Sequence, residues 1–277
     1  MRHIDQAAIQ SHGAIRFRSD YHYAVFEYWR SAKLLRYLER TGITQFGRVL
    51  DDGCGSGGMS VSFAEETDFV IGIDLSDRFA QVGRQLAKER NAKNIRFAQA
   101  NGSELPFPND SFDLILSHAV IEHVSNPSDY LREARRVLRP GGRLFLETAP
   151  YLSPSGVHLP RLKWPIPLYL FLGRRAAFQV SCWLAKHAPQ SLQATHEDSS
   201  FLAKAKRHEE NIDDLVYLVT LKNLRQHIAD AGFELVREDL EISKLAKKIL
   251  PAWLVAKIPD IPFGRNILIT NMEYILT

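Results

Sequence analysis

The amino-acid sequence predicts an α/β protein built on a doubly wound, mostly parallel sheet of seven strands, with helical insertions. Three observations predict this fold. Short apolar runs alternate with amphipathic stretches from Arg48 onward, which is typical of strand–helix units around a parallel sheet. Glycines cluster where the first of these runs ends. The chain has 277 residues, 45% hydrophobic and 24% charged, as is usual for one large globular unit or two small ones.

The first five strands are expected at residues 48–53, 69–75, 95–101, 112–120 and 143–150. Amphipathic spacing predicts helices among them at residues 58–66, 78–90 and 128–138. The last of these helices should end at Pro140, Gly141 and Gly142, which together form a stop signal. Ahead of the sheet, turn-like apolar spacing predicts one amphipathic helix over residues 21–40.

The regular alternation stops after Pro150. Residues 151–219 hold scattered prolines, basic pairs and aromatic side chains, and this stretch is too long for a plain connection. We expect an inserted helical segment there, lying over the site. It is followed by a predicted helix at 221–231, a strand at 233–241, an apolar helical segment at 242–265 and a closing strand at 266–277.

Composition excludes several classes of protein. The net charge of +3 is too small to indicate a nucleic-acid surface. Two cysteines, Cys54 and Cys182, are too few for a disulfide scaffold and lack zinc-ligand spacing, which favours a cytoplasmic location. No window has the length of a membrane span, and residues 1–20 lack the apolar stretch of a signal peptide. Contact with a membrane surface stays open, and nothing indicates the oligomeric state.

The segment VLDDGCGSGG forms the turn between the first strand and the first helix. A turn this tight needs residues without a Cβ atom, and the amides at the start of a helix attract anions. Gly53, Gly55 and Gly58 fit the dinucleotide pattern G-x-G-x-x-G, with Asp74 about 20 residues further on. The same segment fits D-x-G-x-G-x-G, the loop of enzymes that bind S-adenosylmethionine (SAM). The loop alone is therefore compatible with either cofactor.

Four motifs in order resemble those of class I SAM-dependent methyltransferases: VLDDGCGSGG, GIDLS, LPFPNDSFDLILSHAVIEHV and EARRVLRPGGRLFLETAP. The resemblance covers residues 46–150 well and the last helix and strands loosely. It implies a Rossmann-like sheet, SAM as cofactor and a single domain over residues 1–277. Within it we expect N-terminal cap helices (1–45), a cofactor-binding half (46–150), a helical lid (151–219) and a C-terminal helix with strands (220–277). An NAD-dependent dehydrogenase has no reason to carry LPFPNDSFD.

The chemical groups of SAM indicate what the matching residues would bind. Asp74, at the end of the second strand, would accept both hydroxyl hydrogens of the ribose. Asp51 would face the cationic part of the methionine arm, directly or through water, unless it only caps the turn. The cofactor would approach the backbone of four loop residues, Gly53, Cys54, Gly55 and Gly57.

Adenine is expected against the end of the third strand, in AQANGSELPF. Similar methyltransferases usually have an Asp where this chain has Asn101, which keeps a carbonyl acceptor for the exocyclic amine but loses the charge. Gly102 and Ser103 would supply backbone amides beside the ring. Leu75 would pack on the adenine face, although simple core packing predicts an apolar residue there equally well.

The fourth strand ends in SHAVIEHV, and ligands of open sheets bind at the carboxyl ends of strands. Ser117 and His123 are therefore expected at the cofactor, and His118 near the sulfonium. Methyl transfer from a sulfonium is a direct displacement, so a base is needed only when the acceptor starts protonated. His118 is the candidate catalytic base, or else a ring packed on the cofactor.

No metal ion is expected. A similar segment in quinone-biosynthesis O-methyltransferases is E-x-x-E-H, whose acidic residues and His bind a divalent metal. This chain has Ala119 at the first acidic position, so one ligand is missing. Glu122 is instead expected to be a helix-start residue favoured by the helix dipole.

We predict a SAM-dependent methyltransferase that acts on a small or lipid-like metabolite, at oxygen in preference to other atoms. The alternatives are a non-catalytic SAM-binding partner subunit, a nucleic-acid methyltransferase and the dehydrogenase. The nucleic-acid class is disfavoured because TAPY at 148–151 follows the fifth strand instead of the fourth and has Ala149 before its proline, unlike N/D-P-P-Y. The aromatic and basic segment that contains Arg174 and Arg175 is expected to line a lipophilic acceptor pocket as a lid, or to rest on a membrane.

Overall fold

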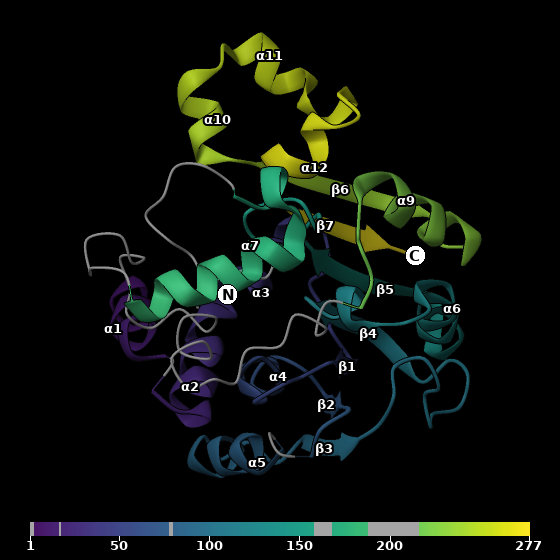
Figure 1. Ribbon diagram of the computed structural model, residues 1–277. Helices are drawn as coiled ribbons and strands as arrows, with labels where there is room; N and C mark the ends of the chain where they lie inside the picture. The colour runs from purple at the N-terminus through teal and green to yellow at the C-terminus, as the bar shows by residue number, and fades with distance from the viewer. Residues whose placement is uncertain (1–2, 17, 78–79, 158–167, 188–215) are drawn as a thin grey trace.

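The computed structural model describes residues 3–16, 18–77, 80–157, 168–187 and 216–277 (Figure 1). Its seven strands are β1 (Arg48–Asp52), β2 (Phe69–Asp74), β3 (Ile95–Gln99), β4 (Phe112–His118), β5 (Leu138–Thr148), β6 (Leu235–Ile242) and β7 (Ile269–Leu276). They form one sheet in the order β3-β2-β1-β4-β5-β7-β6. β7 is antiparallel to β5 and β6, and the other neighbouring pairs are parallel. The predicted doubly wound, mostly parallel sheet of seven strands is confirmed.

The helices ahead of the sheet are α1 (Gln6–Ile15), α2 (Asp20–Arg30) and α3 (Ala32–Arg40). Those between the parallel strands are α4 (Gly58–Ala64), α5 (Ala80–Glu89), the short 3-10 helix η1 (Ile121–His123) and α6 (Pro127–Val137). After β5 come α7 (Leu168–His187), α9 (Leu221–Asp230), α10 (Lys244–Ile249), α11 (Ala252–Lys257), the 3-10 helix η3 (Ile258–Asp260) and α12 (Gly264–Leu268).

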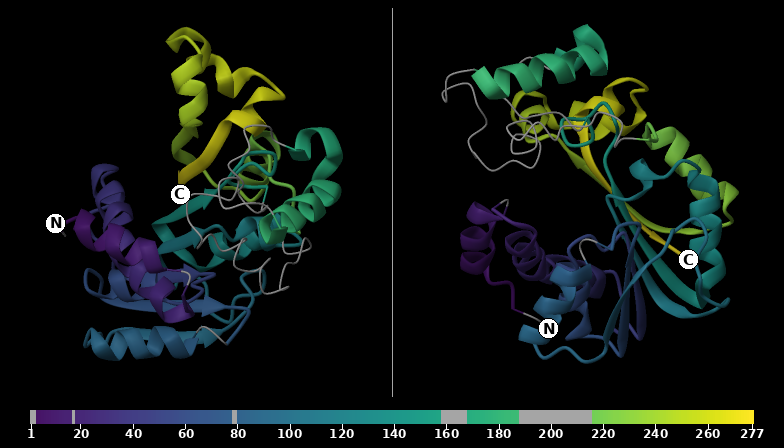
Figure 2. Two further views of the ribbon diagram at one scale, coloured as in Figure 1. Left: turned by 60° about the vertical axis from the view of Figure 1, so that its left-hand side comes forward. Right: turned by 60° about the horizontal axis from the view of Figure 1, so that its bottom comes forward.

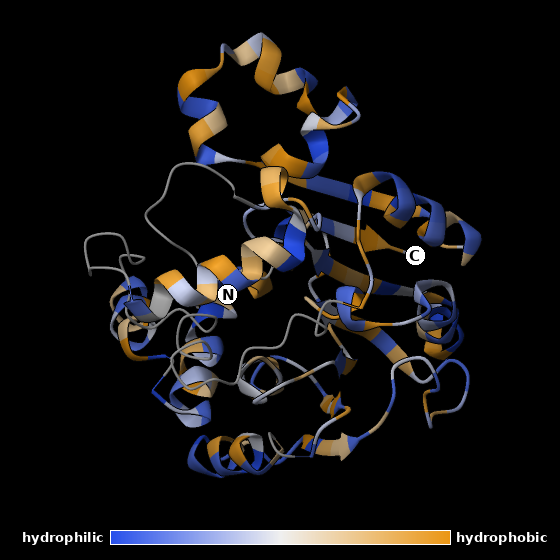
Figure 3. Ribbon diagram, viewed as in Figure 1, coloured by the Kyte–Doolittle hydropathy of each residue, from blue (hydrophilic) through white to orange (hydrophobic). Residues whose placement is uncertain are grey.

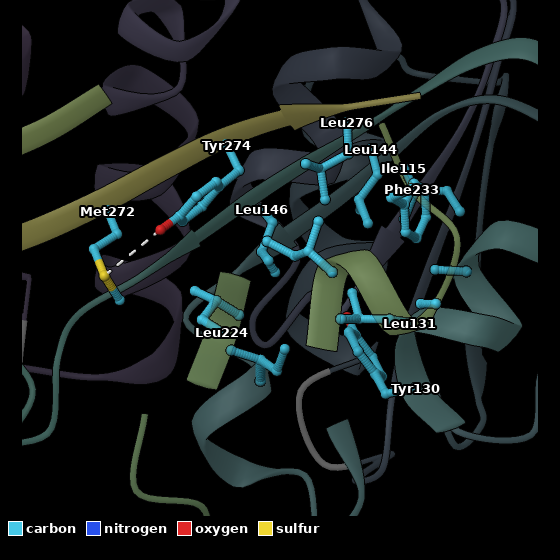
Figure 4. Packing of buried hydrophobic residues seen from close by; sticks show 14 of the residues in the cluster. Ile115, Tyr130, Leu131, Leu144, Leu146, Leu224, Phe233, Met272, Tyr274 and Leu276 are labelled. Atoms are coloured by element: carbon cyan, nitrogen blue, oxygen red, sulfur yellow. Dashed lines mark hydrogen bonds between the residues drawn. The ribbon is translucent and has the colours of Figure 1, made fainter. Parts of the chain in front are cut away.

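Two groups of helices cover the two faces of the sheet (Figure 2). On one face, α2–α5 pack against the sheet, and Leu35 and Phe63 belong to the buried cluster there. On the other face, α6 and α9 contribute Leu131 and Leu224 to a second cluster, shown in Figure 4. Because the central strands are buried on both faces, their sequences are nearly continuous apolar runs.

The strand order changes direction at β1, which lies between β2 and β4. At such a point the loops that follow neighbouring strands turn to opposite faces and leave a crevice at the carboxyl ends of the strands. The glycine-rich turn follows β1, Asp74 ends β2 and His118 ends β4. The topology therefore brings the predicted site residues from separate motifs to one edge of the sheet.

Three expected elements differ in the structure. The helix predicted over residues 21–40 forms two helices, α2 and α3, which meet at Ser31; both the hydroxyl and the N–H of Ser31 donate to the carbonyl of Glu27, at 2.6 and 2.9 Å. The stop signal at residues 140–142 lies inside β5, where Gly141 has a φ of 81° and the pairing with β4 shifts register. Residues 266–268, predicted as strand, belong to α12.

The predicted insert at residues 151–219 is described in part. α7 is helical as expected and is interrupted at Gly173, whose φ of 73° lies outside the helical region. Residues 158–167 and 188–215 lie outside the described part, so the lid remains a prediction. Over the described ranges, no helix combines the length and the apolar character needed to cross a bilayer.

Candidate active site

A cavity of about 220 Å³ lies at the carboxyl ends of β1, β2, β3 and β4. Six of the residues predicted to bind the cofactor line it: Gly53, Asp74, Leu75, Asn101, Gly102 and His123. These residues come from four separate connections of the chain. We call this cavity the first cavity. The motifs found in the sequence meet there.

The glycine-rich turn is tied to β2 by two backbone hydrogen bonds. The amides of Gly53 and Cys54 both donate to the carbonyl of Ile73, at 2.9 and 2.8 Å. Gly53 has a φ of 78°, and a Cβ atom there would lie 2.4 Å from Cγ2 of Val120. Gly57, at the start of α4, has a φ of 75°. A side chain at Gly53 would displace the loop after β4, so the close approach of the two turns requires this glycine.

Asp74 holds the glycine-rich turn against the end of β2. Its Oδ2 accepts the N–H of Gly55 and its Oδ1 accepts the N–H of Ser76, both at 3.0 Å. These bonds fix the carboxylate on the wall of the first cavity. A carboxylate oxygen accepts more than one hydrogen bond, so the structural role of Asp74 leaves capacity for a diol.

Asp51 and Asp52 are consecutive buried acids whose side chains point to opposite sides of β1. Asp51 accepts a hydrogen bond from the hydroxyl of Ser60 on α4 at 2.5 Å. Burial raises the pKa of Asp51 to about 6, although the bond from Ser60 acts against this shift. Asp51 therefore lies behind the glycine-rich turn and not on the wall of the first cavity.

Asp52 lines the first cavity and was not among the predicted residues. Its Oδ2 is buried and has no hydrogen-bond partner among the described residues. Burial raises its pKa to about 7. A Cβ atom on Gly102 would lie 2.6 Å from this oxygen, so Gly102 must be small. The sequence signal that could have identified Asp52 was its place as the second acid of VLDDG, at the end of a strand whose preceding residues are apolar.

Of the residues predicted to bind adenine, Leu75, Asn101 and Gly102 line the first cavity and Ser103 does not. The side-chain oxygen of Asn101 accepts the N–H of Ser103 at 3.0 Å and retains a second lone pair. Leu75 is 66% exposed although it is apolar, and it lines the cavity. Core packing therefore does not explain the apolar residue at Leu75.

Two predicted residues lie behind the cavity wall. Ser117 is fully buried and accepts a hydrogen bond from the hydroxyl of Tyr130 at 2.7 Å, so Tyr130 and not Ser117 lines the cavity. Burial raises the pKa of the Cys54 thiol, which keeps it protonated. The structure thus gives Cys54 no nucleophilic role.

A second cavity of about 410 Å³ is lined by His118 but not by Ala119, which lines the first cavity. Ala119 has a left-handed φ of 56°, and its amide donates to the carbonyl of Glu147 at 2.8 Å. This turn at the end of β4 directs consecutive residues into different cavities. The backbone of residues 118 and 119 is therefore the shared boundary between the two.

His118 forms a pair with Glu147, the last charged residue of β5. Its Nε2 lies 3.0 Å from Oε2 of Glu147 and 3.0 Å from Nη2 of Arg30 on α2. The arginine also donates to Glu27 at 2.8 Å. Burial acts to lower the pKa of His118, but the carboxylate of Glu147 outweighs it, and the pKa is raised. Glu147 was missed because no spacing in the sequence links it to His118.

The rest of the second cavity combines polar and apolar walls. Glu241, Asn271 and Glu273 line it from β6 and β7, and the amide of Asn271 donates to Glu147 at 3.0 Å. Burial and the nearby Glu147 raise the pKa of Glu273 to about 7. Tyr37, Met59 and Phe145 are among the apolar residues. None of these residues was predicted, since they lie in parts of the chain without a motif.

In the part of the chain that the structure describes, no group of three or more His, Cys, Asp or Glu side chains is arranged to hold a metal ion. Glu122, in η1, is buried and accepts a hydrogen bond from the hydroxyl of Thr148 at 2.9 Å. Burial raises the pKa of Glu122. Its contacts are those of a structural residue that joins η1 to the end of β5.

Residues 50–146 match the family model described as a methyltransferase domain. The chain carries a methyltransferase domain. The matched segment runs from β1 to β5 and contains every residue predicted for the cofactor, as well as His118. Glu147 and most of the second cavity lie outside it.

Two curated relatives resemble the same part of the chain. The uncharacterized methyltransferase YcgJ of Bacillus subtilis is 36% identical over 123 residues, which are 43% of this chain and 49% of the relative. The ubiquinone/menaquinone biosynthesis C-methyltransferase UbiE of Azotobacter vinelandii is 37% identical over 113 residues, 39% of this chain and 45% of the relative. The matched segments thus span about half the length of these relatives.

Solved structures share the fold over most of the chain. The crystal structure of YcgJ gives a TM-score of 0.53 at 18% identity and covers 88% of this chain and 97% of its own. A SAM-dependent methyltransferase from Mesorhizobium loti gives 0.51 at 19% identity, over 90% and 97%. The methyltransferase domain thus has the Rossmann-like fold of SAM-dependent methyltransferases that its motifs predicted.

Proposed function

We propose that this protein is a SAM-dependent methyltransferase that transfers a methyl group to a hydroxyl of a small or lipid-like metabolite. The observation that supports it is the arrangement of two cavities on either side of residues 118 and 119. The first cavity gathers the cofactor motifs, and the second contains a His–Glu pair beside open space.

The residues of the first cavity fit SAM. Asp74 would bind the ribose hydroxyls, and Leu75 would cover one face of adenine. Asp52 has a buried oxygen without a partner on the same wall, which a ligand hydrogen or a water would satisfy. SAM supplies an electrophilic methyl group on a sulfonium, so the protein has to align it with the acceptor.

His118 is proposed as the general base. Glu147 orients the imidazole and stabilises its protonated form, as a carboxylate does in other base–orienter pairs. In the form that acts as a base, Nε2 would carry the proton donated to Glu147, so Arg30 near the same nitrogen would pair with Glu27 and the lone pair of Nδ1 would stay free. Nδ1 of the neutral imidazole would take the proton of an acceptor hydroxyl, and the resulting oxyanion would attack the methyl carbon as the bond from this carbon to sulfur breaks.

Methylation at carbon is the second candidate, because UbiE is named a C-methyltransferase. Loss of a hydroxyl proton to His118 also makes an adjacent ring carbon of a phenol or quinol nucleophilic. The same residues therefore serve both reactions, and the placement of the acceptor in the second cavity decides between them. Glu241 and Glu273 are suited to hold acceptor hydroxyls there.

The proposal also includes the location of the enzyme in the cell, the role of the insert and the domain organisation. A cytoplasmic location fits two cysteines that are both free. The insert at 151–219 is proposed to cover the second cavity as a lid, within a single domain over residues 1–277.

Calorimetry and turnover test the proposal. We expect SAM and S-adenosylhomocysteine to bind at micromolar levels and NADH not to bind; NADH binding without SAM binding would overturn it. Release of S-adenosylhomocysteine across a panel of sugars, catechols, quinols and polyketide phenols then tests catalysis, and NMR of the product gives the methylated atom. SAM binding with no turnover on any class would favour the non-catalytic partner subunit instead.

A further inference from the structure

The segment between β6 and β7 protrudes from the end of the molecule opposite to α5 and β3 (Figures 1 and 2). We call residues 244–268, which comprise α10, α11, η3 and α12, the C-terminal protrusion. Its inner side is anchored, since Ala246 and Ile258 are buried and Leu250 and Val255 pack against the main core. Its outer side is therefore held in a defined position by the fold.

The outer side of the C-terminal protrusion is apolar in a way that the core does not explain. Leu245, Ile249, Trp253 and Phe263 are 63%, 67%, 65% and 65% exposed. Figure 3 shows apolar residues on α10 and α11 between hydrophilic ones. Single exposed apolar residues are common, but four large ones within a segment of 25 residues indicate a surface that contacts something.

The charge of the C-terminal protrusion has one dominant sign. It carries five basic residues, Lys244, Lys247, Lys248, Lys257 and Arg265, against the single acid Asp260. The four lysines are exposed. The chain as a whole has a net charge of only +3, so its excess positive charge is concentrated here. A partner that complements this surface must be both anionic and able to bury apolar side chains.

We propose that the C-terminal protrusion docks the protein on an anionic lipid surface. Trp, Leu and Phe side chains enter the boundary between headgroups and acyl chains, while the lysines meet the lipid phosphates. A second copy of the chain fits less well, because a symmetric dimer would place two such positive surfaces against each other. Lys244 follows Glu241 of the second cavity by three residues, so docking would bring that cavity close to the membrane.

Co-sedimentation with vesicles tests this proposal on the full chain. We expect the protein to sediment at low salt with phosphatidylcholine vesicles that contain phosphatidylglycerol, and not with pure phosphatidylcholine. Each lysine near such a surface contributes about 1 kcal/mol, so Lys247→Gln with Lys248→Gln should weaken binding about thirtyfold. The matched control, Lys88→Gln with Lys93→Gln, removes the same charge at the opposite edge of the sheet and should leave binding nearly unchanged.

Trp253→Ala provides a second readout. The emission of the wild type should shift to the blue on anionic vesicles, and this shift should shrink strongly in the variant. Failure of the wild type to sediment at low salt would overturn the proposal, as would equal losses in the two lysine variants. A dimer in light scattering that Trp253→Ala dissociates, with no vesicle binding, would assign the surface to self-association. None of these results depends on whether the protein binds SAM. Failure of this proposal can therefore be distinguished from failure of the proposed function.

Discussion

The pH dependence of SAM binding is expected to depend on Asp51. Burial raises its pKa to about 6. Asp51 lies behind the glycine-rich turn, so its ionised form would attract the ammonium of the methionine arm across this turn or through water, without lining the first cavity. At pH 7 about nine-tenths of the side chain is ionised, and at pH 5 about one-tenth. Linkage then makes SAM binding about tenfold weaker at pH 5 than at pH 7. SAM affinity should fall as the pH falls, because below pH 6 Asp51 is mainly neutral and no longer attracts the ammonium of SAM.

Asp51→Asn tests this expectation, because the amide oxygen still accepts the hydrogen bond from Ser60 while the charge is removed. The variant should bind SAM about tenfold more weakly than the wild type at pH 7 and should show no pH dependence from this site. Calorimetry from pH 5 to 7 measures both. S-adenosylhomocysteine, which keeps the ammonium but not the sulfonium, should show the same slope. A wild type whose affinity is flat over this range, or a variant that keeps the wild-type slope, would refute the reasoning.

Asp74→Ala should weaken SAM binding about ten- to a hundredfold, since two ribose hydroxyls lose a charged acceptor at about 1.5–3 kcal/mol; a change below threefold in calorimetry would contradict that role. His118→Gln should lower kcat and leave SAM affinity within a few fold, and unchanged turnover would exclude a base. For the wild type, kcat should rise with pH through the raised pKa of His118, and Glu147→Gln should move this limb to lower pH; an unmoved limb would contradict the pair. Reversing the charges of Arg174 and Arg175 should leave SAM affinity unchanged and alter turnover only for an anionic acceptor.

The fold and the first cavity were predictable because they depend on local chemistry. Buried parallel strands are apolar runs, and a tight turn into a helix needs glycine, so both leave marks in a short stretch of sequence. Topology then brings Gly53, Asp74 and Asn101 to one wall, as the strand order requires. The positions of Ser117 and Cys54 were harder to predict, because a residue at the end of a strand faces the ligand or the core according to the local twist of the strand.

The second cavity could not be predicted from the sequence because its residues have no fixed spacing. Arg30, Glu147 and Asn271 come from an N-terminal helix, the fifth strand and the last strand. Only tertiary packing places them together, and each would pass in isolation as an ordinary surface residue.

This difference between the two cavities has a chemical basis. The cofactor presents the same groups to every enzyme that uses it, so its binding residues can lie close together in motifs along one half of the chain. An acceptor differs from enzyme to enzyme, and its cavity is lined by the cap helices and the C-terminal strands, which belong to no shared motif. His118 combines the two cases, because it lies within the matched segment while its partners Arg30 and Glu147 lie outside this segment. The identity of the acceptor is therefore to be sought in these partners and in the walls that surround them.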